Sequence, residues 1–165
     1  MASRRKSRER ALQVLYVCDV RKQDPDEAIE AYYYTLHAED EDFTRLVRDR
    51  FMEELVRGTC GEREKLDDRI TRASDHWRLE RMPSVDRNIL RLAAFELFEG
   101  KLPYAVIIDE ALELARRYSG NESVAFVNGV LDAVKANSEK PQKPDTASLP
   151  DTASLPDTKG GKNPI

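Results

Sequence analysis

The chain has 165 residues, of which 35% are charged, and its formal net charge is -4 at pH 7. This length indicates one domain, or one domain with an appendage, and the acidic balance excludes a protein that is basic over its whole surface. The two cysteines are too few for the disulfide framework of a small secreted domain. No apolar run approaches the ~20 residues of a membrane span, so we expect a cytoplasmic protein.

Residues 3–21 are predicted to form the first helix, because their apolar residues repeat at helical spacing. Basic residues crowd its first turns, where each cation opposes the helix macrodipole by some tenths of a kcal/mol. A frayed, solvated helix start is one interpretation of this cluster. The other is phosphate binding, since closely spaced basic side chains can neutralise several phosphates of a nucleic acid. The residues concerned are Arg4, Arg5, Lys6 and Arg8.

The second helix is predicted to begin with Asp24 as its cap and Pro25 in its first turn, and to end near Ala38. It carries consecutive tyrosines at positions 32–34. At about 100° per residue they cannot share one face, so we expect one or two in the core and another at the rim. A stacking platform for nucleic-acid bases is the alternative interpretation.

Apolar spacing predicts a third helix over residues 43–56, ended by Gly58 and Gly61. Residues 62–75 are predicted to form a highly charged helix, and we interpret its charges as a solvated face. Neither of the two histidines has a second histidine or a cysteine at ligand spacing, so no metal site is predicted.

The stretch 85–132 is predicted to form three buried helices with broad apolar faces. Pro83 begins the first of them, Pro103 begins the second, and Asn121 caps the third. Gly129 lies inside the third helix at a cost of about 1 kcal/mol relative to alanine. We interpret this glycine as a sign that another backbone approaches closely.

The composition changes near residue 139. The sequence P-D-T-A-S-L at 144–149 recurs at 150–155, and no periodic apolar pattern remains. The chain is therefore divided into a helical domain, residues 1–138, and a disordered tail, residues 139–165, to which we assign no function.

Three stretches of the helical domain, in this order and spacing, resemble the NusB family of bacterial transcription antitermination factors. They are R-R-K-S-R-E-R-A-L-Q-V-L-Y at 4–16, W-R-L-E-R-M-P-S-V-D-R-N-I-L-R at 77–91, and the run from Pro103 to F-V-N-G-V-L-D at 126–132. The similarity covers residues 3 to about 135. It implies an all-α bundle of about seven helices in two subdomains.

The resemblance also implies a function. Members of the family bind a short single-stranded RNA element, boxA, together with NusE, a ribosomal small-subunit protein that doubles as a transcription factor. The pair helps to load an antitermination complex on RNA polymerase, which supports transcription of ribosomal RNA. We therefore expect an RNA-binding protein with no catalytic residues, no metal and no cofactor.

The same resemblance implies site residues, position by position. The RNA-contacting positions of the family fall on Arg4, Arg5, Lys6, Arg8, Gln13, Tyr16, Tyr118, Glu122, Ser123 and Phe126. The positions facing the protein partner fall on Asp86, Arg87 and Glu96, where an acidic patch would suit a basic ribosomal protein. Ala125 and Ala133 stand where family members often carry basic residues, so RNA binding is expected to depend more on the first helix.

Two other interpretations remain. The helical domain also resembles the N-terminal part of certain ribosomal-RNA cytosine methyltransferases, but these continue into a cofactor-binding domain that the residues after Asp132 do not provide. The second alternative is a protein-binding adaptor without RNA specificity, for which Ala125 and Ala133 argue. An apolar helix face fits a monomer or a homodimer, so the sequence leaves the oligomeric state open.

Overall fold

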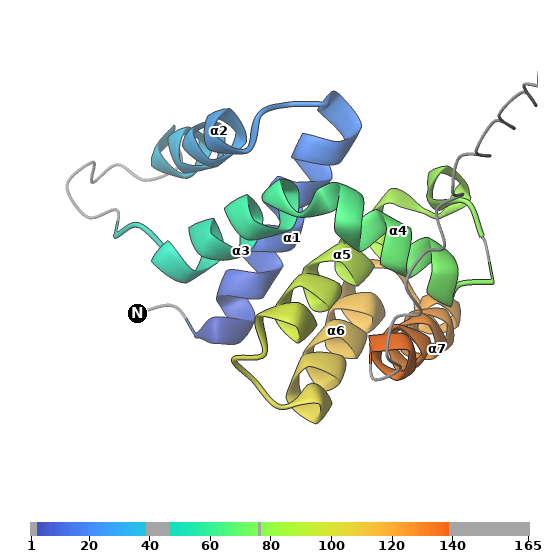
Figure 1. Cartoon of the computed structure of the whole chain (residues 1–165). Helices are drawn as coiled ribbons and strands as arrows, with labels where there is room; N and C mark the ends of the chain where they lie inside the picture. Colours follow the sequence, from blue (N-terminus) through green and yellow to red (C-terminus); the bar gives the residue numbers. More distant parts are fainter. Residues whose placement is uncertain (1–2, 39–46, 76, 139–165) are drawn as a thin grey trace, which may run out of the picture.

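The computed structural model describes residues 3–38, 47–75 and 77–138, and the tail predicted from residue 139 lies outside them. These residues form seven α-helices and one short 3-10 turn, with no strand among them, which confirms the all-α prediction (Figure 1). The helices are α1 (Arg4–Arg21), α2 (Pro25–Ala38), α3 (Arg50–Gly61), α4 (Arg63–Ala73), α5 (Ser84–Glu99), α6 (Tyr104–Tyr118) and α7 (Asn121–Ser138), and the 3-10 turn is Leu79–Arg81. No helix in the described ranges has both the length and the apolar character needed to cross a membrane.

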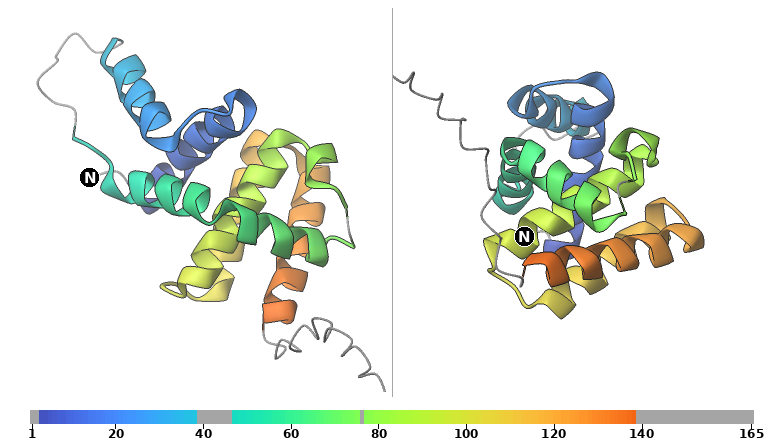
Figure 2. Two further views of the ribbon diagram at one scale, coloured as in Figure 1. Left: turned by 45° about the horizontal axis from the view of Figure 1, so that its top comes forward. Right: turned by 45° about the vertical axis from the view of Figure 1, so that its right-hand side comes forward.

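The central helix of the fold is α5, which contacts α1, α3, α4, α6 and α7. Its Ile89, Leu90 and Leu92 are almost completely buried, because apolar residues lie on nearly every side of the helix. Helices α1, α2 and α3 pack against one another on one side, and α4, α6 and α7 pack on the other (Figures 1 and 2). Since α1 and α3 also contact α5, the two groups share one continuous core.

Helix α2 packs on α1 and α3, and its core residues are Ala28, Ile29 and Tyr33. Tyr33 is buried, Tyr32 is half-buried and Tyr34 is 75% exposed, which confirms that the three rings do not share a face. The hydroxyl of Tyr33 accepts a hydrogen bond of 2.8 Å from the Asp49 amide. This bond ties α2 to the beginning of α3.

Helix α3 begins later than the sequence predicted, at Arg50, because the carboxylate of Asp49 caps it by accepting a hydrogen bond of 3.0 Å from the Met52 amide. Gly58 lies inside this helix and does not end it. A Cβ atom at Gly58 would lie 2.0 Å from the Phe95 ring of α5. Glycine is therefore required here by the close packing of α3 on α5.

Gly129 in α7 has a different environment from the one the sequence suggested. A Cβ atom at this position would meet no atom within 4 Å. The predicted close approach of another backbone is therefore wrong, and within the described residues we have no physical account of this glycine.

Candidate nucleic-acid interface

The basic cluster at the start of α1 divides between two faces of the helix. Arg5, Lys6, Gln13 and Tyr16 are all exposed and lie within about 100° of one another around the helix axis, at about 100° per residue. The side chains of Arg5 and Lys6 are 55% and 54% exposed. Arg4 and Arg8 project from other sides of the helix. One face of α1 therefore presents cations, an amide and an aromatic ring to solvent.

Arg8 is buried, and its side chain is 4% exposed. Its guanidinium donates two hydrogen bonds, of 2.9 and 2.7 Å, to the Glu96 carboxylate of α5. The sequence offered Arg8 as a phosphate ligand. The structure instead places it in a buried ion pair that joins α1 to α5.

Arg4 lies 4.9 Å from the centre of the Phe51 ring of α3, with its charge over the ring face. The side chain is exposed, so this cation–π contact leaves the guanidinium accessible to solvent. Arg4 is therefore available to an anion, but from a different side of α1 than Arg5 and Lys6.

The exposed face of α1 is held beside α6 by ion pairs. Arg5 pairs with Glu110 at 2.8 Å, and Arg117 pairs with Glu9 at 2.5 Å. The hydrogen bond from Arg5, together with its charge, holds the pKa of Glu110 below its usual range. Because Glu9 also accepts a hydrogen bond from Lys6 at 3.1 Å, the cluster at the start of α1 reaches the last turn of α6.

The connection between α6 and α7 carries the second set of predicted residues. Tyr118 is 36% exposed, and its ring centre lies 5.9 Å from the Arg117 guanidinium. Glu122 is exposed in the first turn of α7. The Ser123 hydroxyl instead donates a hydrogen bond of 2.9 Å to the buried carboxylate of Asp86.

Phe126 is half-buried, and its ring lies against the ring of Trp77, with 6.0 Å between the ring centres. Trp77 precedes the 3-10 turn and is 58% exposed, so it is the more accessible ring of the pair. The signal for this ring in the sequence is the lone tryptophan followed directly by Arg78.

The residues predicted to face a protein partner do not form an acidic surface patch. Asp86 is buried and accepts hydrogen bonds from Ser119 and Ser123. Glu96 is buried and paired with Arg8. Both carboxylates are thus occupied inside the molecule, and the expectation of a surface patch is corrected.

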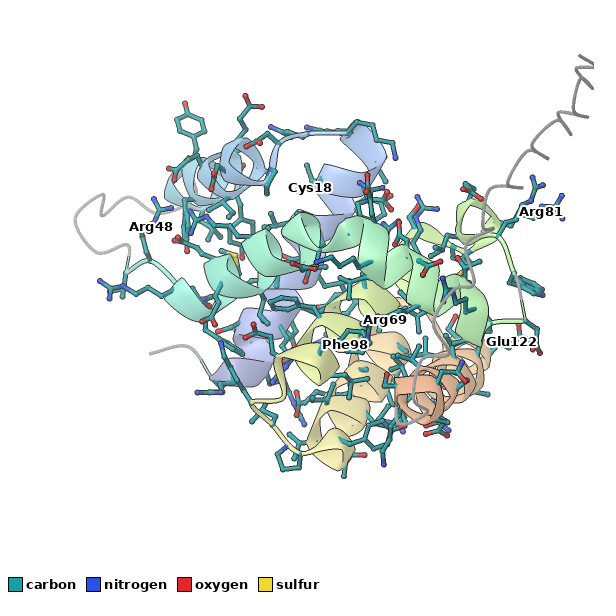
Figure 3. All side chains as sticks on the ribbon, viewed as in Figure 1. Cys18, Arg48, Arg69, Arg81, Phe98 and Glu122 are labelled. Atoms are coloured by element: carbon teal, nitrogen blue, oxygen red, sulfur yellow. The ribbon has the colours of Figure 1, made fainter. Side chains whose placement is uncertain are left out.

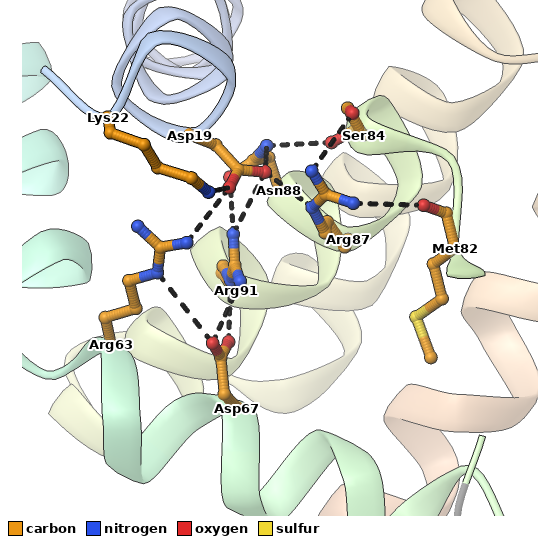
Figure 4. A network of polar contacts seen from close by, with 9 residues as sticks. All are labelled: Asp19, Lys22, Arg63, Asp67, Met82, Ser84, Arg87, Asn88 and Arg91. Carbon is orange, nitrogen blue, oxygen red and sulfur yellow. Dashed lines mark hydrogen bonds and ion pairs between the residues drawn. The ribbon is translucent and has the colours of Figure 1, made fainter. Parts of the chain in front are cut away.

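Arg87, the third partner candidate, belongs to a buried charge network around Asp19 (Figure 4). Asp19 is 2% exposed and accepts hydrogen bonds from Arg87, Asn88 and Arg63 at 2.5, 3.0 and 3.0 Å. Arg91 lies 3.2 Å from the same carboxylate and also binds Asp67 of α4. Part of the charged face of α4, which the sequence predicted to be solvated, therefore forms ion pairs with α1 and α5.

The described residues contain no group of three histidine, cysteine or acidic side chains that could hold a metal ion. The side chains of both histidines fall outside the described part, so the prediction about them stays a prediction. Cys18 is buried and Cys60 half-buried, and neither forms a disulfide.

Comparison with known proteins identifies a family whose sequences resemble this chain. Residues 5–136 match the profile described as the NusB family. The transcription antitermination protein NusB of Solibacter usitatus is 56% identical over 144 residues, which cover 87% of this chain and 96% of the relative. The NusB of Myxococcus xanthus is 42% identical over 142 residues, covering 86% of this chain and all of the relative (100%).

Solved structures give the same result. NusB of T. maritima superposes with a TM-score of 0.68 at 34% identity, covering 82% of this chain and 92% of that one. A crystal structure of the antitermination factors NusB and NusE in complex with dsRNA contains a chain that matches with a TM-score of 0.68 at 26% identity, covering 81% of this chain and 96% of that one.

Proposed function

The chain belongs to the NusB family, and on this basis we propose that it is a transcription antitermination factor that binds boxA-type single-stranded RNA together with NusE. In this role it acts by binding, without catalysis or a cofactor, and supports transcription of ribosomal RNA as part of an antitermination complex on RNA polymerase. The observation that carries the RNA part of the proposal is the exposed face of α1, with Arg5, Lys6, Gln13 and Tyr16 beside the end of α6.

The chemistry of this face suits single-stranded RNA. Unpaired RNA exposes base faces that stack on aromatic rings, and its phosphates are held by cations. In the proposal, Arg5 and Lys6 hold phosphates, and Tyr16 and Tyr118 stack on bases. Gln13 offers both a donor and an acceptor to a base edge.

The cations of this face are paired with carboxylates when RNA is absent, and the pairs are easily exchanged. Both cations are more than half exposed, and each of the less exposed carboxylates has a second arginine nearby. Glu9 keeps Arg117 at 2.5 Å and Glu110 keeps Arg8 at 3.8 Å, so neither carboxylate is left without a cation when Arg5 and Lys6 turn to a phosphate. Arg8 is not part of the proposed phosphate site, since Glu96 already occupies its guanidinium in the core.

The connection between α6 and α7 forms the second part of the proposed site. Glu122 is exposed and can accept hydrogen bonds from base amino groups. Ser123 acts indirectly, by fastening the first turn of α7 to Asp86. Phe126 supports the ring of Trp77 and offers less open surface of its own.

NusE is the proposed protein partner, because a similar structure holds NusB and NusE together with RNA. Asp86, Arg87 and Glu96 would influence this partner only through the placement of α5, since their side chains are engaged in internal contacts.

The proposal is tested by fluorescence anisotropy of a labelled boxA-like RNA and a scrambled RNA, each with and without NusE. We expect tighter binding of the boxA-like RNA and a further gain with NusE. The double substitution Arg5→Gln with Lys6→Gln should weaken binding and make the slope of log affinity against log salt shallower by about 1.4, or ~0.7 for each lost phosphate contact. Lys65→Gln with Arg72→Gln is the matched control, because it removes two exposed and paired cations from α4.

A protein-binding adaptor without RNA specificity is the second candidate, and exposed Ala125 at the start of α7 favours it. Binding to NusE with no preference between the two RNAs would support this candidate. In that case Ala125→Lys should create RNA affinity, because it adds a cation one turn from the exposed Glu122.

A further inference from the structure

The segment between α4 and α5 presents an aromatic ring to solvent in a fixed position. Trp77 is 58% exposed and is the one tryptophan of the chain. Leu79 and Met82 of the same segment are buried in the core, and residues 79–81 form a 3-10 turn. The segment is thus anchored on the core, and the exposure of the ring does not come from an unanchored loop.

Trp77 has a support on one side. The half-buried ring of Phe126 lies 6.0 Å from it, centre to centre, with 49° between the ring planes. Phe126 packs in turn against the hydrophobic core. An exposed indole backed by a second ring is suited to stacking on a planar group, because one more ring can add to the pair without moving core residues.

Two arginines follow Trp77 closely in the sequence. Arg78 and Arg81 are exposed, and within the described ranges neither has a carboxylate within ion-pair distance. Most arginines of this protein are paired, such as Arg57 with Asp26. The acidic residues Asp75 and Glu80 belong to the same segment but leave both guanidinium groups free to bind an anion.

The ring is continuous with the proposed RNA surface. Glu122 and Phe126 are four residues apart on α7, so they lie on the same side of that helix. Asp86 fastens the start of α5 to both Ser119 and Ser123, which holds the segment before α5 close to the start of α7. Figure 3 shows Arg81 and Glu122 at the same end of the molecule.

We propose that Trp77 is a base-stacking platform for single-stranded RNA, and that Arg78 and Arg81 hold the phosphates on either side of the stacked base. The platform extends the surface that starts on α1 and passes Tyr118 and the first turn of α7. This inference rests on the proposed function, and it adds a contact region that lengthens the bound RNA.

The single tryptophan makes a direct test possible. Unlabelled boxA-like RNA is titrated into the full chain while the tryptophan emission is recorded, in parallel with the anisotropy of a labelled copy. We expect the emission to be quenched with the same midpoint as the anisotropy change. Trp77→Ala should weaken binding by roughly 10- to 100-fold, the loss typical of one stacked base.

Two controls separate stacking from folding. Trp77→Phe keeps an aromatic ring and should retain most of the affinity, whereas Tyr34→Ala removes an aromatic ring that is 75% exposed on α2 and should change nothing. Because Trp77→Ala also uncovers Phe126, Arg78→Gln with Arg81→Gln is a second variant. It should make the salt slope shallower by about 1.4 without touching the ring pair.

The outcomes distinguish this inference from the proposed function. If the anisotropy reports RNA binding while the emission and the affinity of Trp77→Ala stay unchanged, the platform is excluded and the function stands. Quenching by NusE alone, with no response to RNA, would make Trp77 a protein contact and overturn the inference. If no RNA binds to the unaltered chain, the proposed function fails and the platform fails with it.

Discussion

The two ends of α1 use charge in opposite ways. Near its beginning, Arg5 and Lys6 are more than half exposed, although their partners Glu110 and Glu9 are only 16% and 5% exposed. Near its end, Asp19 is 2% exposed and is surrounded by Arg63, Arg87 and Arg91. Both ends are charged in the sequence, yet one end serves as a surface and the other as an internal fastening. The residue type does not decide this difference; the partners brought by other helices do.

Removing a charge should therefore cost different amounts of stability at the two ends of α1. A charge that is buried with its partners leaves them uncompensated when it is removed, which destabilises the fold strongly. A charge paired at the surface contributes little to stability and can be exchanged for a ligand. Substitutions at the two ends of one helix can therefore test whether the division holds.

The largest effect is expected at the buried end. Asp19→Asn should lower the free energy of unfolding by about 3–5 kcal/mol, because Arg91 and Arg87, whose side chains are 5% and 15% exposed, lose their shared counter-charge. Urea unfolding followed by circular dichroism measures this change. Asp68→Asn is the control, since that carboxylate is 55% exposed in its pair with Arg72. Similar losses in both variants would show that burial is not what matters at Asp19.

Arg8→Met should come next, with a loss of about 3 kcal/mol, because Glu96 is left buried without a partner. Adding Glu96→Met should recover much of that loss, since two apolar side chains can replace a buried ion pair. A double-mutant cycle measures the recovery. RNA affinity should stay unchanged at temperatures where Arg8→Met is folded. A shallower slope of log affinity against log salt in this variant would show that Arg8 does bind a phosphate.

Acid should weaken the buried end of α1. Burial opposes the charge of Asp19, but the hydrogen bond from Arg87 and the charge of Arg91 outweigh it, so the pKa of Asp19 lies below its usual range. The stability that Asp19 contributes is then complete above its unfolded pKa of ~3.9 and is lost as the pH falls through the folded pKa. Unfolding free energies measured from about pH 5 downward should therefore fall more steeply in the unaltered protein than in Asp19→Asn. Parallel curves would rule out Asp19 as the titrating group.

The smallest effect on stability is expected at the exposed end. Arg5→Gln with Lys6→Gln should leave the unfolding midpoint nearly unchanged, because both cations are more than half exposed and Glu110 and Glu9 each keep a second arginine. Thermal unfolding provides the measurement. A large loss would mean that these residues fasten α1 to α6, and any accompanying loss of RNA affinity could then be an indirect effect.

The helices were largely predictable from the sequence, because their signals are local. Pro25, Pro83 and Pro103 mark three helix beginnings, and the apolar spacing placed α5, α6 and α7 close to their observed bounds. The start of α3 was less predictable, since apolar spacing ran past its cap at Asp49.

The role of individual charges could not be predicted, because their partners are distant in the sequence. Arg8 and Glu96 are 88 residues apart, and Asp19 and Arg87 are 68 apart. Helical spacing does distinguish Arg8 from Arg5, because Arg8 shares a side of α1 with Ala11, Leu12 and Leu15. The buried side of α1 was therefore predictable, whereas the partner of Arg8 on α5 was not. Trp77 was likewise visible as a residue but not as half of a ring pair.

The contact between Gly58 and Phe95 has a consequence for how such sequences can diverge. Since even a methyl group at position 58 would overlap the Phe95 ring, the two positions form one epistatic unit. A side chain at position 58 is therefore better tolerated when a smaller residue stands at position 95, so the effect of each change depends on the other. Gly58→Ala should therefore destabilise the unaltered protein by about 1–3 kcal/mol but cost less in a Phe95→Leu background, and equal costs in the two backgrounds would show that the positions drift independently.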